Sequence, residues 1–303
     1  MTHNYPLDQA YAVCRAIARR EAKNFYYAFI ALPTARKNAI CAIYAFMRKA
    51  DDLADDESMS RDERSRHLDA WQAEWRSVCN GGSTADPVFI AVHDATERFA
   101  IPLELLDELV AGTTMDLKPA ASAEPDTYAT FADLYGYCYL VASVVGLVCI
   151  RIFGYKDRAA EKLAEETGIA FQLTNILRDV AEDAARNRVY LPLEDLAAHN
   201  VSLKSLLKRP SGAAPTPQER ALLSEIGQRA EKYYRSAQAL LPLIDRESRP
   251  ALWVLVAIYH ALLKRIRHAD YDVFTQRASV PLVQKLAILV VGLARMTAAR
   301  LFA

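Results

Sequence analysis

The sequence lacks an excess of charge of either sign. Its 303 residues carry 37 lysines and arginines against 37 aspartates and glutamates, so the formal net charge at pH 7 is zero. Proteins that bind nucleic acid usually concentrate positive charge on one face or across the whole chain. We therefore expect no nucleic-acid partner.

Cysteine is scarce and has no regular spacing. The chain holds five cysteines, an odd number, and none of them forms a Cys-x-x-Cys pair. The six histidines show no ligand spacing either. A disulfide framework or a zinc site would need pairs at short spacing. The pattern is typical of reduced, mostly buried thiols and favours a cytoplasmic location.

Apolar runs long enough to span a bilayer are also lacking. The longest uncharged run, between Asp133 and Arg151, falls short of the roughly 20 apolar residues that a span requires. We interpret it as a buried helix. The N-terminus shows no signal peptide, because no basic segment precedes an apolar core there. The segment 282–303 is apolar with three charges, which permits peripheral membrane association.

Alternating runs of β-branched residues do not stand out, whereas apolar residues recur with a helical period along most of the chain. The segment 209–217 has the composition of a linker, but the part that follows it is too small and too apolar to stand alone. We predict one all-α domain over residues 1–303. The expected helices cover 7–30, 34–57 with Thr34 as N-cap, 60–79, a segment from 87, 103–115, 130–153, 158–183, 218–245, 249–268 and 281–302.

The most informative stretch runs from Gln172 to Asp183. On a helix, Asn175, Asp179 and Asp183 stand at i, i+4 and i+8 and share one face with Gln172. Like charges one turn apart cost an isolated helix about 0.2–0.5 kcal/mol per pair. Such a face is therefore unfavourable unless a cation or a cationic partner lies against it.

A second acidic stretch, residues 44–57, holds five acids within seven residues. Tyr44, Arg48, Asp51 and Asp55 share one face of the expected helix. Acidic runs are often solvated faces, but apolar periodic residues flank both stretches and place them on helices that pack in a core. Two such helices indicate one shared site for Mg2+, whose carboxylate ligands are commonly completed by substrate phosphates.

An allylic diphosphate with a long apolar tail would suit these residues. Arg48, Arg178 and Arg188 could take up charge as diphosphate departs. The carbocation left behind needs a dry pocket with aromatic rings, and residues 135–146 alternate tyrosines with small residues. Periodicity alone favours plain core packing for these tyrosines over a role beside a carbocation.

Two patterns carry a resemblance to a known family. They resemble the two aspartate-rich motifs of the squalene/phytoene synthases, the head-to-head trans-isoprenyl diphosphate synthases. The resemblance implies one helical bundle around a deep central cavity, with the motifs facing each other across its mouth. It also implies that two identical prenyl diphosphates are joined through a cyclopropylcarbinyl diphosphate. The patterns are Tyr44-x-x-x-Arg48-x-x-Asp51-Asp52-x-x-Asp55 and Gln172-x-x-Asn175-Ile-x-Arg178-Asp179-x-x-x-Asp183.

The resemblance implies a role for each matching residue. Four aspartates and one amide would hold Mg2+, with Mn2+ as an alternative: Asp51, Asp55, Asn175, Asp179 and Asp183. Tyr137 would assist proton removal or steady the cation, although released diphosphate could equally act as the base. The substrate-binding set is Phe25, Tyr44, Arg48, Gln172, Asn175, Arg178, Arg188, Tyr190 and Tyr259 at the head, and Ala142 and Val145, with Ala164 and Phe171, along the tail.

The chain departs from the family pattern at two places. It has Ala22-Lys23-Asn24-Phe25 where the family often has Ser-x-Ser-Phe, so Asn24 can still donate a hydrogen bond to a phosphate but Ala22 cannot. It has Arg186-Asn187-Arg188 where the family usually has Asn-Glu-Arg, so one acid is missing. Neither change affects the aspartates.

The run 144–154 indicates the product, because it resembles the bacterial squalene-pathway branch more than typical phytoene synthases. The leading interpretation is condensation of two farnesyl diphosphates to presqualene diphosphate, squalene or both. The first alternative is a phytoene synthase that joins two geranylgeranyl diphosphates, and the second is a non-catalytic isoprenoid-binding or assembly protein. A role for NADPH stays open, because reductive members of the family also lack a dinucleotide fingerprint. Other enzymes of the pathway are candidate partners.

Overall fold

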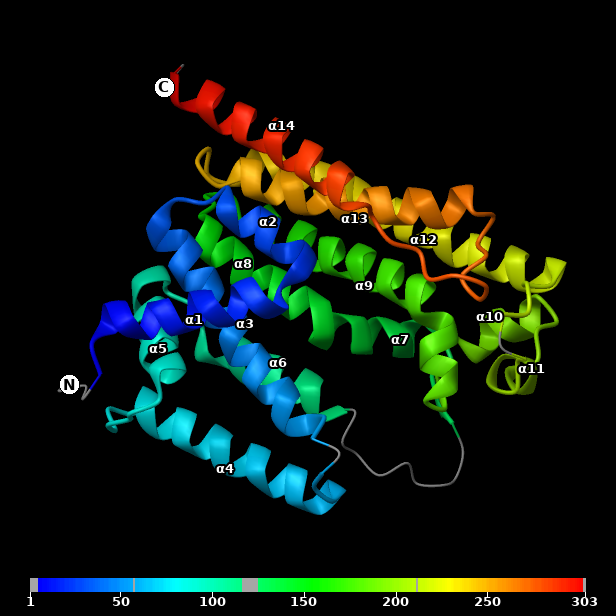
Figure 1. The fold of residues 1–303 in the computed structure, drawn as a ribbon, viewed down its shortest axis with the longest axis horizontal. Helices are drawn as coiled ribbons and strands as arrows, with labels where there is room; N and C mark the ends of the chain where they lie inside the picture. Colours follow the sequence, from blue (N-terminus) through cyan, green and yellow to red (C-terminus); the bar gives the residue numbers. More distant parts are fainter. Residues whose placement is uncertain (1–4, 57, 116–124, 211, 302–303) are drawn as a thin grey trace.

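Helices make up most of the chain in a computed structural model that describes residues 5–56, 58–115, 125–210 and 212–301 (Figure 1). The all-α prediction is confirmed. In chain order the helices are α1 (Leu7–Glu21), α2 (Lys23–Ile30), α3 (Thr34–Ala54), α4 (Arg61–Cys79), α5 (Pro87–Phe99), α6 (Leu103–Met115), α7 (Phe131–Cys138), α8 (Val144–Phe153), α9 (Ala159–Ala185), α10 (Leu193–Ala198), α11 (Leu203–Leu207), α12 (Pro217–Leu240), α13 (Arg249–His268) and α14 (Leu282–Leu301).

Several ends follow local capping rules. The side chains of Ser60 and Thr216 each accept a hydrogen bond from the backbone N–H three residues later. The glutamate at that position accepts a hydrogen bond from the backbone N–H of the capping residue. Pro87 begins α5 behind Asp86, as predicted. A 3-10 turn, η2 (Leu241–Leu243), follows α12 inside the segment predicted as one helix. Helices α10 and α11 are absent from the prediction because five or six residues are too few to show a helical period.

The predicted helix over 7–30 is wrong as one element, because it breaks at Ala22. Ala22 is buried and nearly helical, with φ −73° and ψ −2°. The two halves pack on different partners: α1 lies against α3 and α5, whereas α2 lies against α13. Tertiary packing therefore overrides a continuous helical pattern.

Helix α3, which carries the acidic stretch 44–57, also ends earlier than predicted, at Ala54. Asp55 is its C-cap, and Asp56 lies beyond it. Carboxylates at a helix C-terminus oppose the helix dipole, which favours termination before the acids accumulate. At the other end Pro33 is the N-cap, and Thr34 is already the first helical residue, so the predicted cap is wrong by one position.

The predicted helix over 130–153 contains a π-helical turn, η1 (Tyr139–Ser143), between α7 and α8. By length and composition Phe131–Phe153 could cross a membrane. It packs instead against α6 and α9 within the bundle, as the sequence interpretation of a buried helix expects. Ser143 in η1 donates a hydrogen bond to the Glu165 backbone oxygen at 2.7 Å, which ties this turn to α9. Single π turns frequently occur at functional sites.

Two short strands join the segment before α7 to the end of α9. Strands β1 (Asp126–Thr127) and β2 (Arg188–Val189) pair in parallel, with Asp126 opposite Arg188. They form the one strand-paired sheet among the described residues. This pair positions the residues that follow α9 beside the N-terminus of α7.

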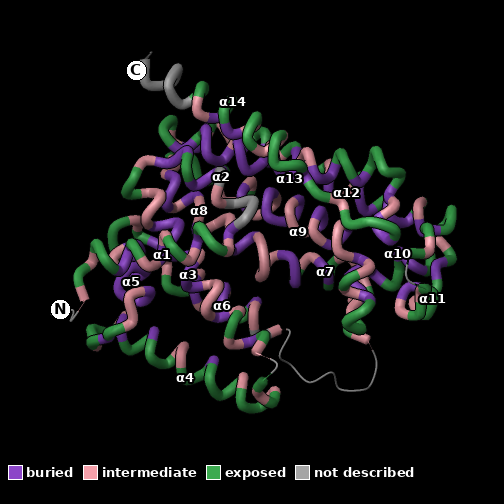
Figure 2. Tube along the Cα trace, in the orientation of Figure 1, coloured by how far each residue is buried: buried purple, intermediate pink, exposed green. Residues whose placement is uncertain are grey.

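Five helices close a ring around the middle of the molecule. Helix α3 contacts α8, α8 contacts α9, α9 contacts α13, α13 contacts α2, and α2 contacts α3. The two motif helices, α3 and α9, therefore occupy separate places in one ring. Figure 2 shows buried residues concentrated on these central helices, while α4 and α14 lie at the edges with long exposed stretches. The central cavity itself stays a prediction.

Candidate active site

The first motif lies on the last turns of α3. Asp51 accepts a hydrogen bond from the Thr113 hydroxyl of α6 at 3.2 Å. Arg48 pairs with Asp52 one turn later, at 2.5 Å. Asp55, just past the helix, is exposed. Thr113 was not among the predicted residues, because 62 positions separate it from its partner.

The charge on Asp51 is unfavourable where it stands. Burial raises the pKa of this carboxyl to about 6, and neighbouring Asp55 adds to the effect, against the hydrogen bond from Thr113 and the charge of Arg48. A carboxylate that is costly to ionise is poised to take a cation.

The second motif occupies one face of α9, as its spacing predicts. Asn175 donates a hydrogen bond to the Gln172 side chain at 3.2 Å. The other polar atom of Asn175, Oδ1, is buried and has no hydrogen-bond partner among the described residues. A buried acceptor without a partner costs about 1–3 kcal/mol. The atom is thus a ready ligand for a cation.

Two arginines hold Asp179. Arg178 forms a bidentate pair with it, with Nε 2.8 Å from Oδ1, and Arg277 donates to the same oxygen at 2.7 Å. Arg277 also pairs with Glu182 at 3.1 Å. Burial works to raise the pKa of Asp179, but hydrogen bonds and charges from the arginines outweigh it and hold that pKa below its usual value.

Asp183 behaves differently one turn later. Burial and the charge of Asp179 raise its pKa to about 6, although Arg188 and Arg186 act in the opposite direction. Each motif therefore contains one carboxylate with a raised pKa, Asp51 on α3 and Asp183 on α9. Both lie on the helices that the sequence predicts to share a site.

Two tyrosines connect the motifs. Tyr259 of α13 is buried and interacts with Asn175 by a hydrogen bond and with Arg178 by charge. It also interacts electrostatically with Tyr44 of α3, on the same turns as Arg48 and Asp51. Burial raises the pKa of Tyr259 to about 12, so this hydroxyl stays protonated. The predicted residues from α3, α9 and α13 thus meet around one place.

Tyr137 and Tyr190 come together in an aromatic stack. Their rings lie 4.9 Å apart and nearly parallel, and both residues are buried. Tyr128, beside β1, packs against both rings at 5.4 and 6.1 Å and was missed from the sequence. Arg188 in β2 lies 3.8 Å from Asp126 and near Asp183. The strand pair therefore brings the predicted Tyr137, Arg188 and Tyr190 to the end of α9.

The predicted tail residues lie farther along the same helices. Ala142 of η1 and Val145 of α8 are half-buried, and Phe171 of α9 stacks on Tyr259 at 4.4 Å. Phe25 belongs to α2, but its side chain lies outside the described residues. From Phe171 to Asp183, α9 changes from apolar to amide to carboxylate side chains. This order matches a molecule with an apolar tail and an anionic head.

The residues fit a magnesium site that substrate completes. Within the described part of the chain, no three His, Cys, Asp or Glu residues gather closely enough to hold a metal by themselves. Mg2+ usually takes only one or two carboxylates and fills its other positions with water and substrate phosphate. The orphaned Asn175 oxygen and the raised pKa values of Asp51 and Asp183 are features that a cation would relieve.

Comparison with known proteins identifies the family of the chain. The family model for squalene/phytoene synthase matches residues 18–284. The chain belongs to the squalene/phytoene synthase family. Among curated relatives, the 15-cis-phytoene synthase of Synechococcus elongatus is 34% identical over 96% of this chain and 94% of its own length. The phytoene synthase of Arthrospira platensis is 35% identical over 93% and 92%.

Solved structures of the squalene/phytoene synthase family share the fold. A dehydrosqualene synthase in complex with ligand superposes with a TM-score of 0.82 and 29% identity, over 96% of this chain and 98% of that one. Squalene synthase HpnC from Alicyclobacillus acidocaldarius gives 0.78 and 27%, over 88% and 97%. The chain is thus a head-to-head prenyltransferase by family, and the all-α fold is shared with these enzymes.

Proposed function

We propose that this protein joins two farnesyl diphosphates head to head to form presqualene diphosphate, squalene or both, in a Mg2+-dependent reaction. The observation that carries the proposal is the pair of aspartate motifs on α3 and α9. Their buried carboxylates, Asp51 and Asp183, and the unpartnered Asn175 oxygen suit a cation, and apolar side chains follow farther along α9. Two similar solved structures are described as dehydrosqualene and squalene synthases, which supports the farnesyl chain length.

The roles of the residues follow from their contacts. Asp51, Asp179 and Asp183, with Asn175 and the exposed Asp55, would hold Mg2+, which supplies positive charge to the departing diphosphate. Arg178 and Arg48 would donate hydrogen bonds to diphosphate oxygens and take up charge as the carbon–oxygen bond breaks. Gln172 and Tyr259 would orient the head through the hydrogen bonds centred on Asn175.

The tyrosine stack would serve the cationic stage. Tyr137, Tyr190 and Tyr128 present aromatic rings beside the end of α9, and an aromatic face attracts a carbocation electrostatically. Released diphosphate or the Tyr137 oxygen would accept the proton that leaves. Burial of the two inner rings excludes water, which would otherwise capture the cation as an alcohol.

Phytoene synthesis is the second candidate, and the curated relatives favour it. Two of them, from Synechococcus elongatus and Arthrospira platensis, are described as phytoene synthases at 34% and 35% identity. Geranylgeranyl diphosphate is one isoprene unit longer than farnesyl diphosphate. The choice therefore rests on the depth available to the tail near Ala142 and Val145.

Product analysis by mass spectrometry tests both candidates. Purified protein is incubated with Mg2+ and either diphosphate, each with and without NADPH. We expect presqualene diphosphate from farnesyl diphosphate, and squalene only where NADPH is present if this chain also performs the reduction. Phytoene from geranylgeranyl diphosphate would replace the farnesyl assignment.

Three variants connect the result to the site. Asp51→Asn and Asp179→Asn should each lower kcat at least about a hundredfold, because each removes a carboxylate from one motif. Ala142→Phe should shift chain-length preference toward the shorter substrate. If neither substrate releases diphosphate and the aspartate variants behave as the original chain, the protein is a non-catalytic binder.

A further inference from the structure

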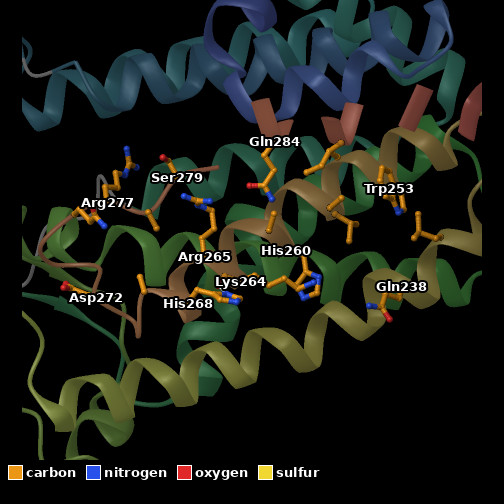
Figure 3. A pocket seen from close by; sticks show the side chains of 18 residues that line it. Gln238, Trp253, His260, Lys264, Arg265, His268, Asp272, Arg277, Ser279 and Gln284 are labelled. Atoms are coloured by element: carbon orange, nitrogen blue, oxygen red, sulfur yellow. Dashed lines mark hydrogen bonds between the residues drawn. The ribbon is translucent and has the colours of Figure 1, made fainter. Parts of the chain in front are cut away.

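A groove lies on the outer side of the bundle, and one of its ends reaches Arg277, the partner of Asp179 (Figure 3). Its volume is about 1030 Å³, and it runs along α13 between α12, α14 and the loop 272–279. The α13 residues that line it recur three and four positions apart, so they form one face of the helix. Tyr259 lies on another face, where it contacts Phe171 and Asn175. The groove and the candidate active site are therefore on different sides of α13.

The groove is apolar toward one end and basic toward the other. Figure 3 shows Trp253 near one end and Arg277 with Asp272 near the other, with Lys264, Arg265 and His268 nearer to this second end. The apolar part is lined by Leu241, Trp253, Val256, Ala257, Ala261 and Ile288. Along the helix, Trp253 and Lys264 are about 16 Å apart at 1.5 Å per residue. This length accommodates an extended hydrocarbon chain.

Most charges at the basic end already have partners. Arg277 pairs with Asp179 and Glu182, and Asp272 accepts two hydrogen bonds from Thr275, at 2.8 and 3.1 Å. Lys264 and Arg265 differ from these, because neither forms an ion pair with a carboxylate of the described residues. They lie in the last turns of α13, where the negative end of the helix dipole favours cations. With no carboxylate paired to them among the described residues, both charges can meet an external anion beside the apolar part of the groove.

We propose that this groove binds an anionic amphiphile with a phosphate-class head and one long apolar chain. The head lies at Lys264 and Arg265, and the chain runs past Ala261 and Val256 toward Trp253. Charge complementarity sets the direction, because Lys264 and Arg265 line one end of the groove, whereas Arg295 near the other end stacks on the Trp253 ring at 4.2 Å and is not part of the lining. The volume is of the size that protein pockets use for ligands of this kind. Binding here goes beyond the proposed reaction and does not depend on it.

Quenching of tryptophan fluorescence tests the site on the full chain. The probe is a lysophosphatidic acid with a brominated acyl chain, kept below its micelle concentration and without Mg2+. Trp253 lines the groove, whereas Trp71 and Trp75 pack with Phe46 and Phe89 under α4. We expect saturable quenching that Trp253→Phe removes. A matching probe with a phosphocholine head should bind at least tenfold more weakly, since its head has no net charge.

Variants separate the groove from the rest of the surface. Lys264→Glu combined with Arg265→Glu should weaken binding at least tenfold, and Ala261→Phe should do so by filling the groove without adding a tryptophan. Arg267→Glu is the matched control, because Arg267 is exposed on the same turn but does not line the groove. Asp51→Asn should leave binding unchanged, because the residues that interact with Asp51 do not line the groove, and this separates the groove from the diphosphate site.

The outcomes are distinct. Absence of saturable quenching in the unmodified chain, or equal affinity for both heads, would overturn the proposal. A loss of binding in Arg267→Glu as large as that in the Lys264→Glu, Arg265→Glu variant would also overturn the proposal. Where binding is found, competition by farnesyl monophosphate assigns the natural ligand to prenyl phosphates, and competition by glycerophospholipid heads alone assigns it to membrane lipids.

Discussion

Two aspartates of the site hold their charge at a cost to folding. Burial raises the pKa of Asp51 and of Asp183 to about 6, whereas an unfolded chain would titrate them near about 3.9. The folded protein therefore binds more protons than the unfolded chain between about pH 4 and pH 6, and stability from these groups falls as pH rises through that window. Above about pH 6 both carboxyls are ionised in the folded and the unfolded chain, so the lost stability no longer changes with pH.

Asp51→Asn should therefore stabilise the protein at pH 7.5. We expect the melting temperature to rise by a few degrees, because a neutral amide removes a buried charge, and we expect a flatter pH dependence between pH 4 and 6. Thermal unfolding across that range measures both. Asp69→Asn on the exposed face of α4 is the control and should change neither. A lower melting temperature for Asp51→Asn at pH 7.5 would contradict the electrostatic account.

Arg277 is a positioning residue for Asp179. Its guanidinium donates two hydrogen bonds to Asp179 Oδ1, at 2.7 and 3.1 Å. Arg277→Gln should raise the pKa of Asp179, so the acid limb of the kcat/KM profile should move to higher pH. Arg267→Gln removes a charge of the same kind without touching the motif, and its profile should match that of the unmodified chain. An unchanged acid limb in Arg277→Gln would mean that Arg178 alone sets the state of Asp179.

At the scale of the element, the π turn η1 is pressed onto α9. A Cβ atom at Gly168 would lie 2.5 Å from Ser143 Cα, which is backbone and has no room to yield cheaply. This approach carries Ala142 beside Phe171 and the apolar part of α9. The helix pair therefore depends on a residue without a side chain at that position.

Gly168→Ala should lower the free energy of unfolding by about 1–3 kcal/mol through overpacking. Gly136→Ala on α7 is a matched comparison, because a Cβ there meets nothing within 4 Å. That change should be neutral or stabilising by up to about 1 kcal/mol, owing to the helix propensity of alanine. Urea unfolding measures both variants. Equal effects would show that the close approach does not govern packing here.

At the scale of the molecule, the extensive contacts that connect α3 with α9 run through other helices of the ring. A ligand that contacts both α3 and α9 would hold the ring together and stabilise the native state by mass action. Mg2+ with inorganic diphosphate is such a ligand, since the metal joins carboxylates to phosphate oxygens.

Mg2+ and diphosphate together should raise the melting temperature by about 5 °C when present at a hundredfold excess over their dissociation constant. Either one alone should have a much smaller effect. Asp51→Asn and Asp179→Asn should each remove most of the joint increase in melting temperature, because each removes a carboxylate that would bind Mg2+ on one of the two motif helices. A full shift from diphosphate without metal would point to the arginines as the whole binding site. Differential scanning fluorimetry is sufficient to measure it.

The sequence by itself determined the helical class, most helix positions and both aspartate motifs. These features are local: residues one turn apart on a helix share a face whatever surrounds them, so Asn175, Asp179 and Asp183 line up from spacing alone. The breaks within expected helices were not determined in this way. Ala22 and the turn η1 interrupt apolar periodicity because separate parts of the chain must reach different partners.

Only the tertiary structure decided which distant residues join the motifs. Arg277 stands 98 positions from Asp179, and Thr113 stands 62 from Asp51, so no pattern within a helix could connect them. Tyr128 reaches Tyr137 and Tyr190 through the pairing of β1 with β2, which are two residues each. The outer groove likewise arises only when α12, α13 and α14 pack. Local periodicity positions side chains on a helix, and packing alone brings those of separate helices within hydrogen-bond distance.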